Sequence, residues 1–324
     1  MKSSNNSTQN SLEAAAYGGD GWQQRSSTHK QEMGSIWENY GIDTEWRTLK
    51  TVLLHQPGQE LNLSSDEQDK YLLLDTVDIK KIQEEHQKLV EAYKAVGVEV
   101  HTVDPQFEPA PNQMFCADLF VMTPQGAILG RPASMVRAGE ERQVARRLAE
   151  LGIPILKTLT GKAAFEGADL MWLDETTAMI GKGHRTNQQA IDQIRTVLTG
   201  IDCELIAVDM PYGTMHFMGM LRIPKRDLAI CWPRRTPHTA VIALRERGYK
   251  VAFLPEQEDS AMSRAMNFVT LMSGKILMVE GLAKAQQFYE SEGIECLTSS
   301  TNELSKAAGN IGCLTGVLRR EMMS

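Results

Sequence analysis

The residue best suited to nucleophilic chemistry is Cys313, which lies near the C-terminus in AAGNIGCLTGVLRR. Gly309 and Gly312 beside it permit a tight backbone turn and an exposed thiol. A free thiol has a pKa of about 8.5, so a nucleophilic cysteine needs a base or a nearby cation. A cationic substrate can itself supply that help, and we therefore take Cys313 as the candidate nucleophile.

Two carboxylates stand at the starts of apolar segments that read as buried strands. Asp118 separates NQMFCA from LFVM, and Glu166 lies in AAFEGADLMWL, three residues before Asp169. A carboxylate in such a place is costly to bury unless a cation pairs with it. Each acid alone is better explained by a structural cap or turn bond. As a set that converges on one pocket, they favour a cationic ligand.

His216, in YGTMHFMGMLRI, stands at another strand start and is flanked by apolar residues. A lone histidine in such surroundings is usually a core residue, but its position matches that of the carboxylates. We therefore predict general acid/base work for His216. Arg137 and Arg185 follow hairpins and can pair with a substrate carboxylate, although composition alone favours solvated surface pairs. Asn112 belongs to the same group of polar residues near strand starts.

The composition narrows the class of protein. A net charge of -7 and the lack of a basic stripe argue against nucleic-acid binding. A membrane span needs roughly 18 uninterrupted apolar residues, and the sequence contains no such run. The N-terminus lacks the apolar segment of a secretory signal. The five cysteines form no CxxC pair. We expect reduced thiols, no zinc site and a cytoplasmic location.

A unit of strand, turn, strand, helix and strand recurs from about residue 49. Copies two to five follow one another at intervals of roughly 50 residues, a period typical of propellers and arrays. Single units cannot bury their apolar faces, so neighbours must close around an axis. We predict an α/β fold, a ring of five ββαβ repeats, with a doubly wound α/β sheet as the second choice. Residues 1–40 are predicted to be a mostly disordered polar tail, and 41–324 a single catalytic domain.

Six motifs in order resemble those of the guanidino-group-modifying enzymes, the pentein or amidinotransferase superfamily. LKTVLLHQPGQEL is similar to the opening of arginine deiminases, PNQMFCAD to PNxxFxRD, FEGADL to EGGD and GKGHRTN to GxxxRT. MHFMG resembles the segment with the catalytic histidine, and NIGCLT resembles GxxCxT. The resemblance covers about residues 46–324.

The resemblance implies a five-bladed α/β propeller that acts on arginine or an Nω-substituted arginine without a metal or organic cofactor. It implies Cys313 as nucleophile and His216 as general acid/base, with Asp118 and Glu166 holding the guanidinium. Asn112, Arg137 and Arg185 would bind the α-amino acid end, and Asp169 is counted with the substrate-binding residues. The expected partner is an arginine-like amino acid, and homo-oligomerisation is left open.

Three positions depart from the deiminase pattern. Ala117 stands where deiminases usually have an arginine, and Ala308 is near the position of another of their arginines. Met218 stands where they usually have a second aspartate. The loss at 218 removes one anchor from the guanidinium, so a site of this kind can admit a substituted guanidinium such as methylarginine, which argues against a plain arginine deiminase. An amidinotransferase is the first alternative, followed by an arginine dihydrolase and by a non-catalytic binding module on the same propeller.

Overall fold

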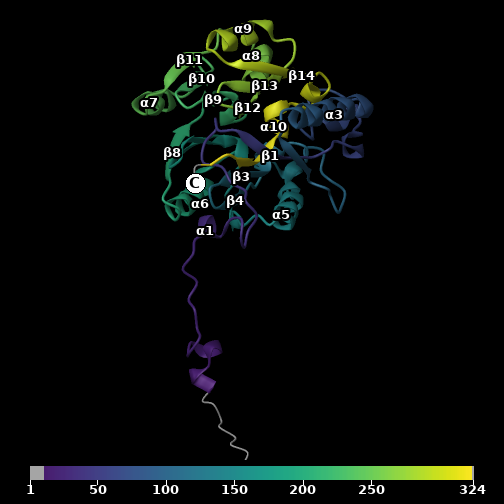
Figure 1. Ribbon diagram of the computed structural model, residues 1–324. Helices are drawn as coiled ribbons and strands as arrows, with labels where there is room; N and C mark the ends of the chain where they lie inside the picture. Colours follow the sequence, from purple (N-terminus) through teal and green to yellow (C-terminus); the bar gives the residue numbers. More distant parts are fainter. Residues whose placement is uncertain (1–10, 323–324) are drawn as a thin grey trace, which may run out of the picture.

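The computed structural model describes residues 11–322 and contains five separate three-stranded sheets arranged as a ring (Figure 1). In each sheet the middle strand pairs antiparallel with the inner strand and parallel with the outer one. The sheets are β15–β1–β2, β3–β4–β5, β6–β7–β8, β9–β10–β11 and β12–β13–β14. Five separate sheets exclude the doubly wound sheet and confirm the predicted five-bladed α/β propeller.

Blades two to five follow the predicted order of strand, turn, strand, helix and strand. The second blade has β3 (Phe120–Thr123), β4 (Gly126–Leu129), α5 (Glu140–Glu150) and β5 (Ile155–Lys157). The third has β6 (Leu170–Asp174), β7 (Thr177–Lys182), α6 (Gln188–Thr199) and β8 (Glu204–Asp209). The fourth has β9 (Leu221–Lys225), β10 (Leu228–Cys231), α7 (His238–Glu246) and β11 (Lys250–Phe253). The fifth has β12 (Val269–Met272), β13 (Lys275–Val279), α9 (Ala283–Ser291) and β14 (Glu295–Ser299), and α8 (Asp259–Met266) precedes it.

The first blade is built from both ends of the domain. Its middle and outer strands are β1 (Leu49–Leu54) and β2 (Glu99–Thr102), with α3 (Ile79–Ala95) between them. Its inner strand is β15 (Gly316–Arg320), which pairs antiparallel with β1. The insertion after β1 carries the short α2 (Ser65–Gln68). The last strand of the sequence therefore closes the ring.

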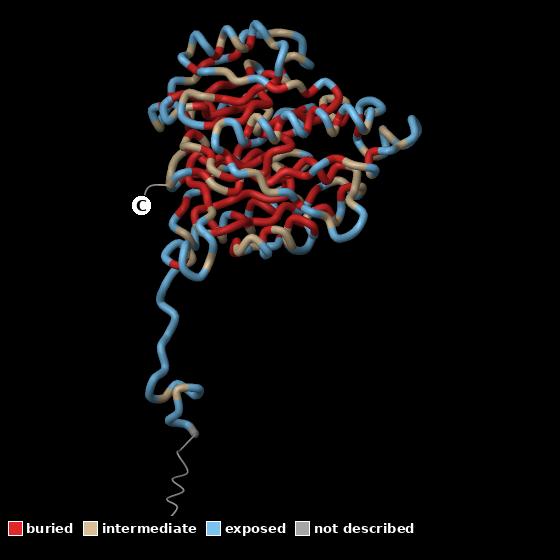
Figure 2. Tube along the Cα trace, turned by 45° about the vertical axis from the view of Figure 1, so that its right-hand side comes forward, coloured by how far each residue is buried: buried red, intermediate tan, exposed pale blue. Residues whose placement is uncertain are grey.

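Apolar side chains are buried between neighbouring blades as well as within them. One cluster joins Leu53 of the first blade to Ile128 of the second and Ile194 of the third. Another joins Leu54 of the first blade to Val269 and Leu277 of the fifth. Figure 2 shows the buried strands inside and the more exposed helices around them. This interlocking is the physical reason why a unit of this kind needs its neighbours.

The N-terminal segment leaves the ring as an exposed arm (Figures 1 and 2). Within it, α1 (His29–Glu32) ends at the buried Glu32, whose carboxylate accepts hydrogen bonds from Arg25 and Trp37. Nearer the ring, the hydroxyl of Tyr40 lies 3.0 Å from Nε2 of His101. Residues 1–10 of the predicted tail lie outside the described residues, and the boundary at residue 40 stays a prediction.

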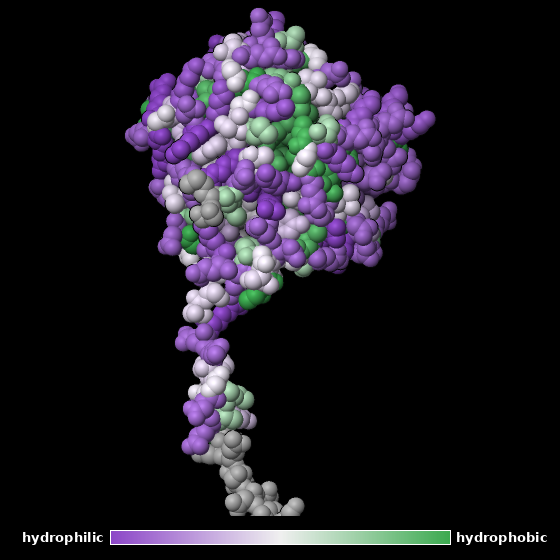
Figure 3. Space-filling view, in the orientation of Figure 1, coloured by the Kyte–Doolittle hydropathy of each residue, from purple (hydrophilic) through white to green (hydrophobic). Residues whose placement is uncertain are grey.

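None of the helices within residues 11–322 is long and apolar enough to cross a bilayer. On the face shown in Figure 3, hydrophilic side chains cover most of the surface, and apolar ones gather between the α8–α9 region and α3.

Candidate functional site

The inner strands of all five blades begin around the ring axis, and the residues just before them form the site. Asp118 lies in the one-turn helix α4 (Cys116–Leu119), directly before β3. Glu166 and His216 each cap a 3₁₀ turn, before β6 and β9 respectively. Cys313 lies in α10 (Ile311–Leu314), just before β15. Because β15 closes the first blade, a cysteine from the end of the sequence reaches the centre.

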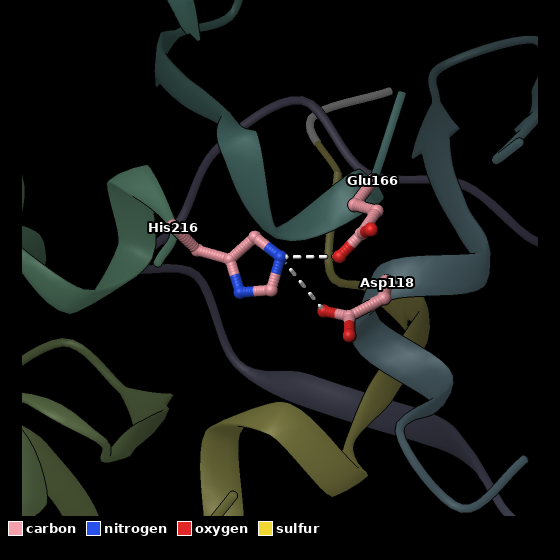
Figure 4. Close-up of side chains that lie close together, drawn as sticks. All are labelled: Asp118, Glu166 and His216. Carbon is pink, nitrogen blue, oxygen red and sulfur yellow. Dashed lines mark hydrogen bonds and ion pairs between the residues drawn. The ribbon is translucent and has the colours of Figure 1, made fainter. Parts of the chain in front are cut away.

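Asp118, Glu166 and His216 point toward one another (Figure 4). Nε2 of His216 lies 2.6 Å from Oε2 of Glu166 and 3.7 Å from Oδ1 of Asp118. All three side chains are buried. Their ligand atoms lie close enough together to be a candidate metal cluster. Two arginines already pair with these carboxylates, however, so the protein's own cations balance the acids.

Arg137 is the centre of that ion-pair network. Its Nη1 donates to Oδ2 of Asp118 at 2.7 Å and to Oε2 of Glu166 at 3.3 Å, and its Nη2 donates to Glu140 at 2.9 Å. Only 2% of the surface of Arg137 is exposed. Arg137 is therefore not in the solvated surface pair that the composition of the chain alone favoured. Each of its three nitrogens donates to a protein carboxylate, which leaves one of the two N–H groups of Nη2 without an acceptor among the described residues.

Arg185 lies at the edge of the network. Its Nη1 donates to Oε2 of Glu166 at 2.8 Å, and 13% of its side chain is exposed. It is therefore partly buried, and it keeps access to the open side of the site. Of the two predicted arginines, Arg185 is the more exposed.

The network fixes where protons reside. Burial lowers the pKa of His216, but the charge of Asp118 and the hydrogen bond and charge of Glu166 together raise it above its ordinary value. Burial opposes ionisation of Glu166, yet its bond to His216 and the two arginines hold its pKa well below the usual range. We therefore take Glu166 as ionised at neutral pH, and its carboxylate favours a proton on His216.

A pocket opens beside this network. Six of the residues that line it were singled out from the sequence: Asn112, Asp118, Arg137, Arg185, His216 and Cys313. The other lining residues are mostly apolar or small: Leu72, Phe115, Met215, Ala307, Ala308 and Gly309. The structure thus brings most of the predicted residues to one pocket, including the candidate nucleophile.

Glu166, Asp169 and Met218 do not line this pocket. Glu166 lies behind His216. Asp169 accepts from the hydroxyl of Thr186 at 2.6 Å and from the backbone N–H of Phe217 at 2.9 Å, and burial raises its pKa to about 6. Asp169 thus fixes the backbone next to His216. At the pocket wall, Asn112 donates to the carbonyl of Tyr71 at 2.7 Å and holds the insertion after β1.

One carboxylate oxygen of the site accepts no hydrogen bond from the described residues. Oδ1 of Asp118 is buried and makes no hydrogen bond to any described residue, while Oδ2 is taken by Arg137. A buried, unsatisfied carboxylate oxygen costs free energy that a donor from a ligand can recover. The pocket therefore presents one free anionic acceptor beside a histidine and a thiol.

The thiol of Cys313 is held by Asn267, a residue that the sequence reasoning missed. Nδ2 of Asn267 lies 3.0 Å from Sγ, and its Oδ1 accepts from the backbone N–H groups of Gly312 and Cys313 at 2.7 and 3.3 Å. Burial and the charge of Asp118 raise the pKa of Cys313, whereas Asn267 lowers it. Asn267 precedes β12 as Asp118 precedes β3, so the repeat frame itself was the signal that could have found it.

Glu140 was also missed. It is the first residue of α5, and it holds Arg137 through Nε and Nη2. Burial raises the pKa of Glu140 to about 7, against the lowering effect of Arg137. In the sequence, Glu140 reads as an ordinary acidic residue in the first turn of an amphipathic helix, so no local signal marks it.

Comparison with known proteins gives a family match over just over half of the chain. The family model described as N,N dimethylarginine dimethylhydrolase, eukaryotic, matches residues 64–232. An uncharacterised Bacillus subtilis protein, YkgA, is 24% identical over 86% of this chain and 94% of its own length. An N(G),N(G)-dimethylarginine dimethylaminohydrolase from Streptomyces coelicolor is 25% identical over 71% of this chain and 83% of its own length.

Solved structures show the same fold. A DDAH from Pseudomonas aeruginosa, solved with citrulline, has a TM-score of 0.69 at 19% identity over 85% of this chain and 100% of its own. SxtG, an amidinotransferase from Microseira wollei, has a TM-score of 0.70 at 13% identity over 88% of this chain and 98% of its own. At these identities the likeness establishes the fold alone.

Proposed function

This chain belongs to the N,N-dimethylarginine dimethylhydrolase family, and from that premise we propose that it hydrolyses Nω-methylated arginine to citrulline and a methylamine. The family places the chain among the enzymes that act on guanidino groups by hydrolysis or amidino transfer. N,N-dimethylarginine is the substrate that we propose first, with Cys313 as nucleophile and His216 as general acid and base.

The unpartnered Oδ1 of Asp118 is the observation that carries this proposal. Asp118 lines the same pocket as Cys313 and His216, and we infer that one N–H of a bound guanidinium donates to this oxygen. A guanidinium is a poor electrophile because its charge is delocalised. A fixed carboxylate on one side localises that charge and orients the carbon toward sulfur.

The scarcity of free acceptors favours a substituted guanidinium. Oε2 of Glu166 already faces three donors, and Met218 offers no carboxylate. Unmodified arginine would bring further N–H groups that need acceptors. A dimethylated nitrogen brings none, and its methyl groups suit apolar lining residues such as Leu72, Phe115 and Met215.

We assign the amino acid end of the substrate to Arg185, whose partly exposed guanidinium lines the same pocket. A planar guanidinium is well suited to a carboxylate. Asn112 is the further polar group on that wall. Arg137 acts as a positioning residue, because it holds Oδ2 of Asp118 and leaves Oδ1 free.

In the first half of the reaction, the bound cation offsets the charge of Asp118 that disfavours the Cys313 thiolate. Sγ attacks the guanidinium carbon and the bond from carbon to the methylated nitrogen breaks. The proton lost by the thiol reaches the leaving amine through His216, which Glu166 holds in place. A covalent thiouronium intermediate with one positive charge remains on Cys313.

In the second half, His216 accepts a proton from water, and the oxygen adds to the thiouronium carbon. The bond between carbon and sulfur breaks, His216 returns its proton to Sγ, and the second proton of the water passes to solvent. These steps release citrulline and restore the Cys313 thiol. Asn267 donates to the departing sulfur and stabilises its negative charge.

The test is product analysis by mass spectrometry with arginine, monomethylarginine and dimethylarginine, each with and without glycine as an amine acceptor. We expect citrulline and dimethylamine from dimethylarginine, with a higher kcat/KM than for arginine. Cys313→Ser should give no turnover. Cys296→Ser, which changes a half-buried cysteine in β14, should match the wild type.

Other products would replace the proposal. An amidinated glycine would identify an amidinotransferase, and ornithine with ammonia would identify a dihydrolase. Absence of any product from the wild type would leave a binding module. Full turnover by Cys313→Ser would remove Cys313 from the mechanism.

A further inference from the structure

A second cavity, of about 80 Å³, lies on the ring axis behind the layer of proposed catalytic residues. Residues of the inner strands β3, β6, β9, β12 and β15 form its walls. Gly167 and Gly312, which adjoin Glu166 and Cys313, also line it. None of the proposed catalytic steps uses this cavity.

Arg320, the last residue of β15, lines the cavity, and only 2% of its surface is exposed. Its Nη1 donates to the backbone carbonyls of Arg47 and Thr270, at 2.7 and 2.8 Å. Its Nε is buried and has no hydrogen-bond partner among the described residues. An N–H donor on this cation is therefore left unused beside an open space.

Arg222, in β9, presents a second buried guanidinium to the same cavity. Its Nε donates to the carbonyl of Met266 at 3.0 Å, and its Nη2 donates to that of Phe268. Neither contact involves a carboxylate. Within residues 11–322, neither Arg222 nor Arg320 forms an ion pair, and burial lowers the pKa of both.

The charges around the cavity do not balance. Glu45 is the one acidic residue of its lining, and its Oε1 is occupied by the backbone N–H of Trp172 at 3.1 Å. Two guanidinium groups against one carboxylate leave one positive charge. A buried positive charge without a counter-ion is unfavourable, and most of the other lining residues are apolar or small.

We propose that this cavity binds one small monovalent anion, a halide or a short carboxylate, between Arg222 and Arg320. Such an ion accepts from the unused Nε of Arg320 and neutralises the remaining charge. A methyl group at Gly312 would lie 2.6 Å from Nη2 of Arg222, so this guanidinium packs directly beneath the helix that carries Cys313. The anion would thus lie on the far side of α10 from the substrate pocket.

The first test uses the wild-type protein alone. Crystals soaked in sodium bromide should show an anomalous peak between the two guanidinium groups, and crystals soaked in sodium formate should show a planar group at that place. Water-like density in both soaks, with no anomalous signal, would overturn the proposal. A peak in only one soak would identify which of the two kinds of anion the cavity accepts.

The second test measures the melting temperature in solution at constant ionic strength. Bromide or formate should raise the melting temperature of the wild type saturably, because an ion that binds only the folded state stabilises it. Arg320→Met should abolish this rise, while Arg319→Met, which changes the half-buried neighbour outside the cavity lining, should keep it. An equal rise in all three proteins would indicate a general salt effect and contradict the site. If Arg320→Met does not fold, the crystal soaks decide.

Discussion

Asn267 shows how a single neutral side chain can prepare a buried cysteine. Its carboxamide donates to Sγ of Cys313 and accepts from two backbone N–H groups of α10. The donor stabilises a thiolate, and the acceptor fixes the backbone that carries it. Burial and the charge of Asp118 both disfavour the thiolate of Cys313, and the donor of Asn267 opposes them. Loss of this donor would therefore disfavour the thiolate further.

Replacing Asn267 separates these two contributions. Asn267→Ala should lower kcat by roughly 10- to 100-fold, because a hydrogen bond to a charged group contributes about 1.5–3 kcal/mol. Asn267→Asp keeps an acceptor for the two N–H groups but places a negative charge near sulfur. It should therefore raise the pKa of the thiol further, as read from the pH dependence of alkylation by iodoacetamide. If both variants alkylate with the wild-type pH profile, Asn267 does not act on the thiolate.

Sequence alone predicted which residues meet at the axis better than it predicted what each one touches. The carboxylates and His216 were found because strand starts must converge in a ring. That Glu166 binds His216 and stays off the pocket wall depends on side-chain directions, which residue spacing does not encode. Arg137 was predicted to bind the substrate, and composition alone favoured a surface pair. Its place in a buried ion-pair network depends on acids from other segments, such as Asp118 and Glu166, which residue spacing does not reveal.

At the scale of elements, α10 is a one-turn helix whose glycine serves close packing. Gly312 does not require a left-handed backbone, and alanine is the better helix former by about 1 kcal/mol. A Cβ there would, however, lie 2.6 Å from Nη2 of Arg222 and 2.8 Å from Oδ1 of Asn267. The glycine lets both side chains lie against the turn that presents Cys313.

Gly312→Ala should therefore lower kcat by at least about 10-fold with little change in KM, because it displaces Asn267 without entering the substrate pocket. Gly219→Ala is the matched control. It changes a glycine near His216 whose added Cβ would meet no atom within 4 Å. Steady-state kinetics on both variants test the prediction, and a wild-type kcat in Gly312→Ala would contradict it.

The repeat frame predicted the strands and helices of blades two to five well, because each copy carries its own turn and cap residues. It left the first blade without an inner strand. The pairing of β15 with β1 joins residues about 270 positions apart, and such long-range pairing leaves no local pattern beyond the apolar strand itself. The sequence therefore predicted the units and their ring, but not the strand that closes it.

At the scale of the whole molecule, that closure makes the centre of the ring part of one cooperative structure. The first and last segments of the domain share a sheet, and the apolar clusters cross from blade to blade. The buried acids at the centre come from different blades, so unfolding of the ring exposes them together. Their protonation should then appear in the free energy of global unfolding.

Glu140 gives the clearest prediction of this kind. Its pKa is raised from 4.5 to about 7 in the folded state by burial, to which the charges of Asp118 and Glu166 add. Between these values the folded protein holds a proton that the unfolded chain has lost, so stability falls as the pH rises. The free energy of unfolding of the wild type should fall relative to Glu140→Gln by on the order of 2–3 kcal/mol between pH 4.5 and pH 7. Urea unfolding across this range measures the difference. Glu141→Gln, at the next position of α5, should keep the wild-type slope, and parallel profiles for the wild type and Glu140→Gln would show that Glu140 is ionised throughout.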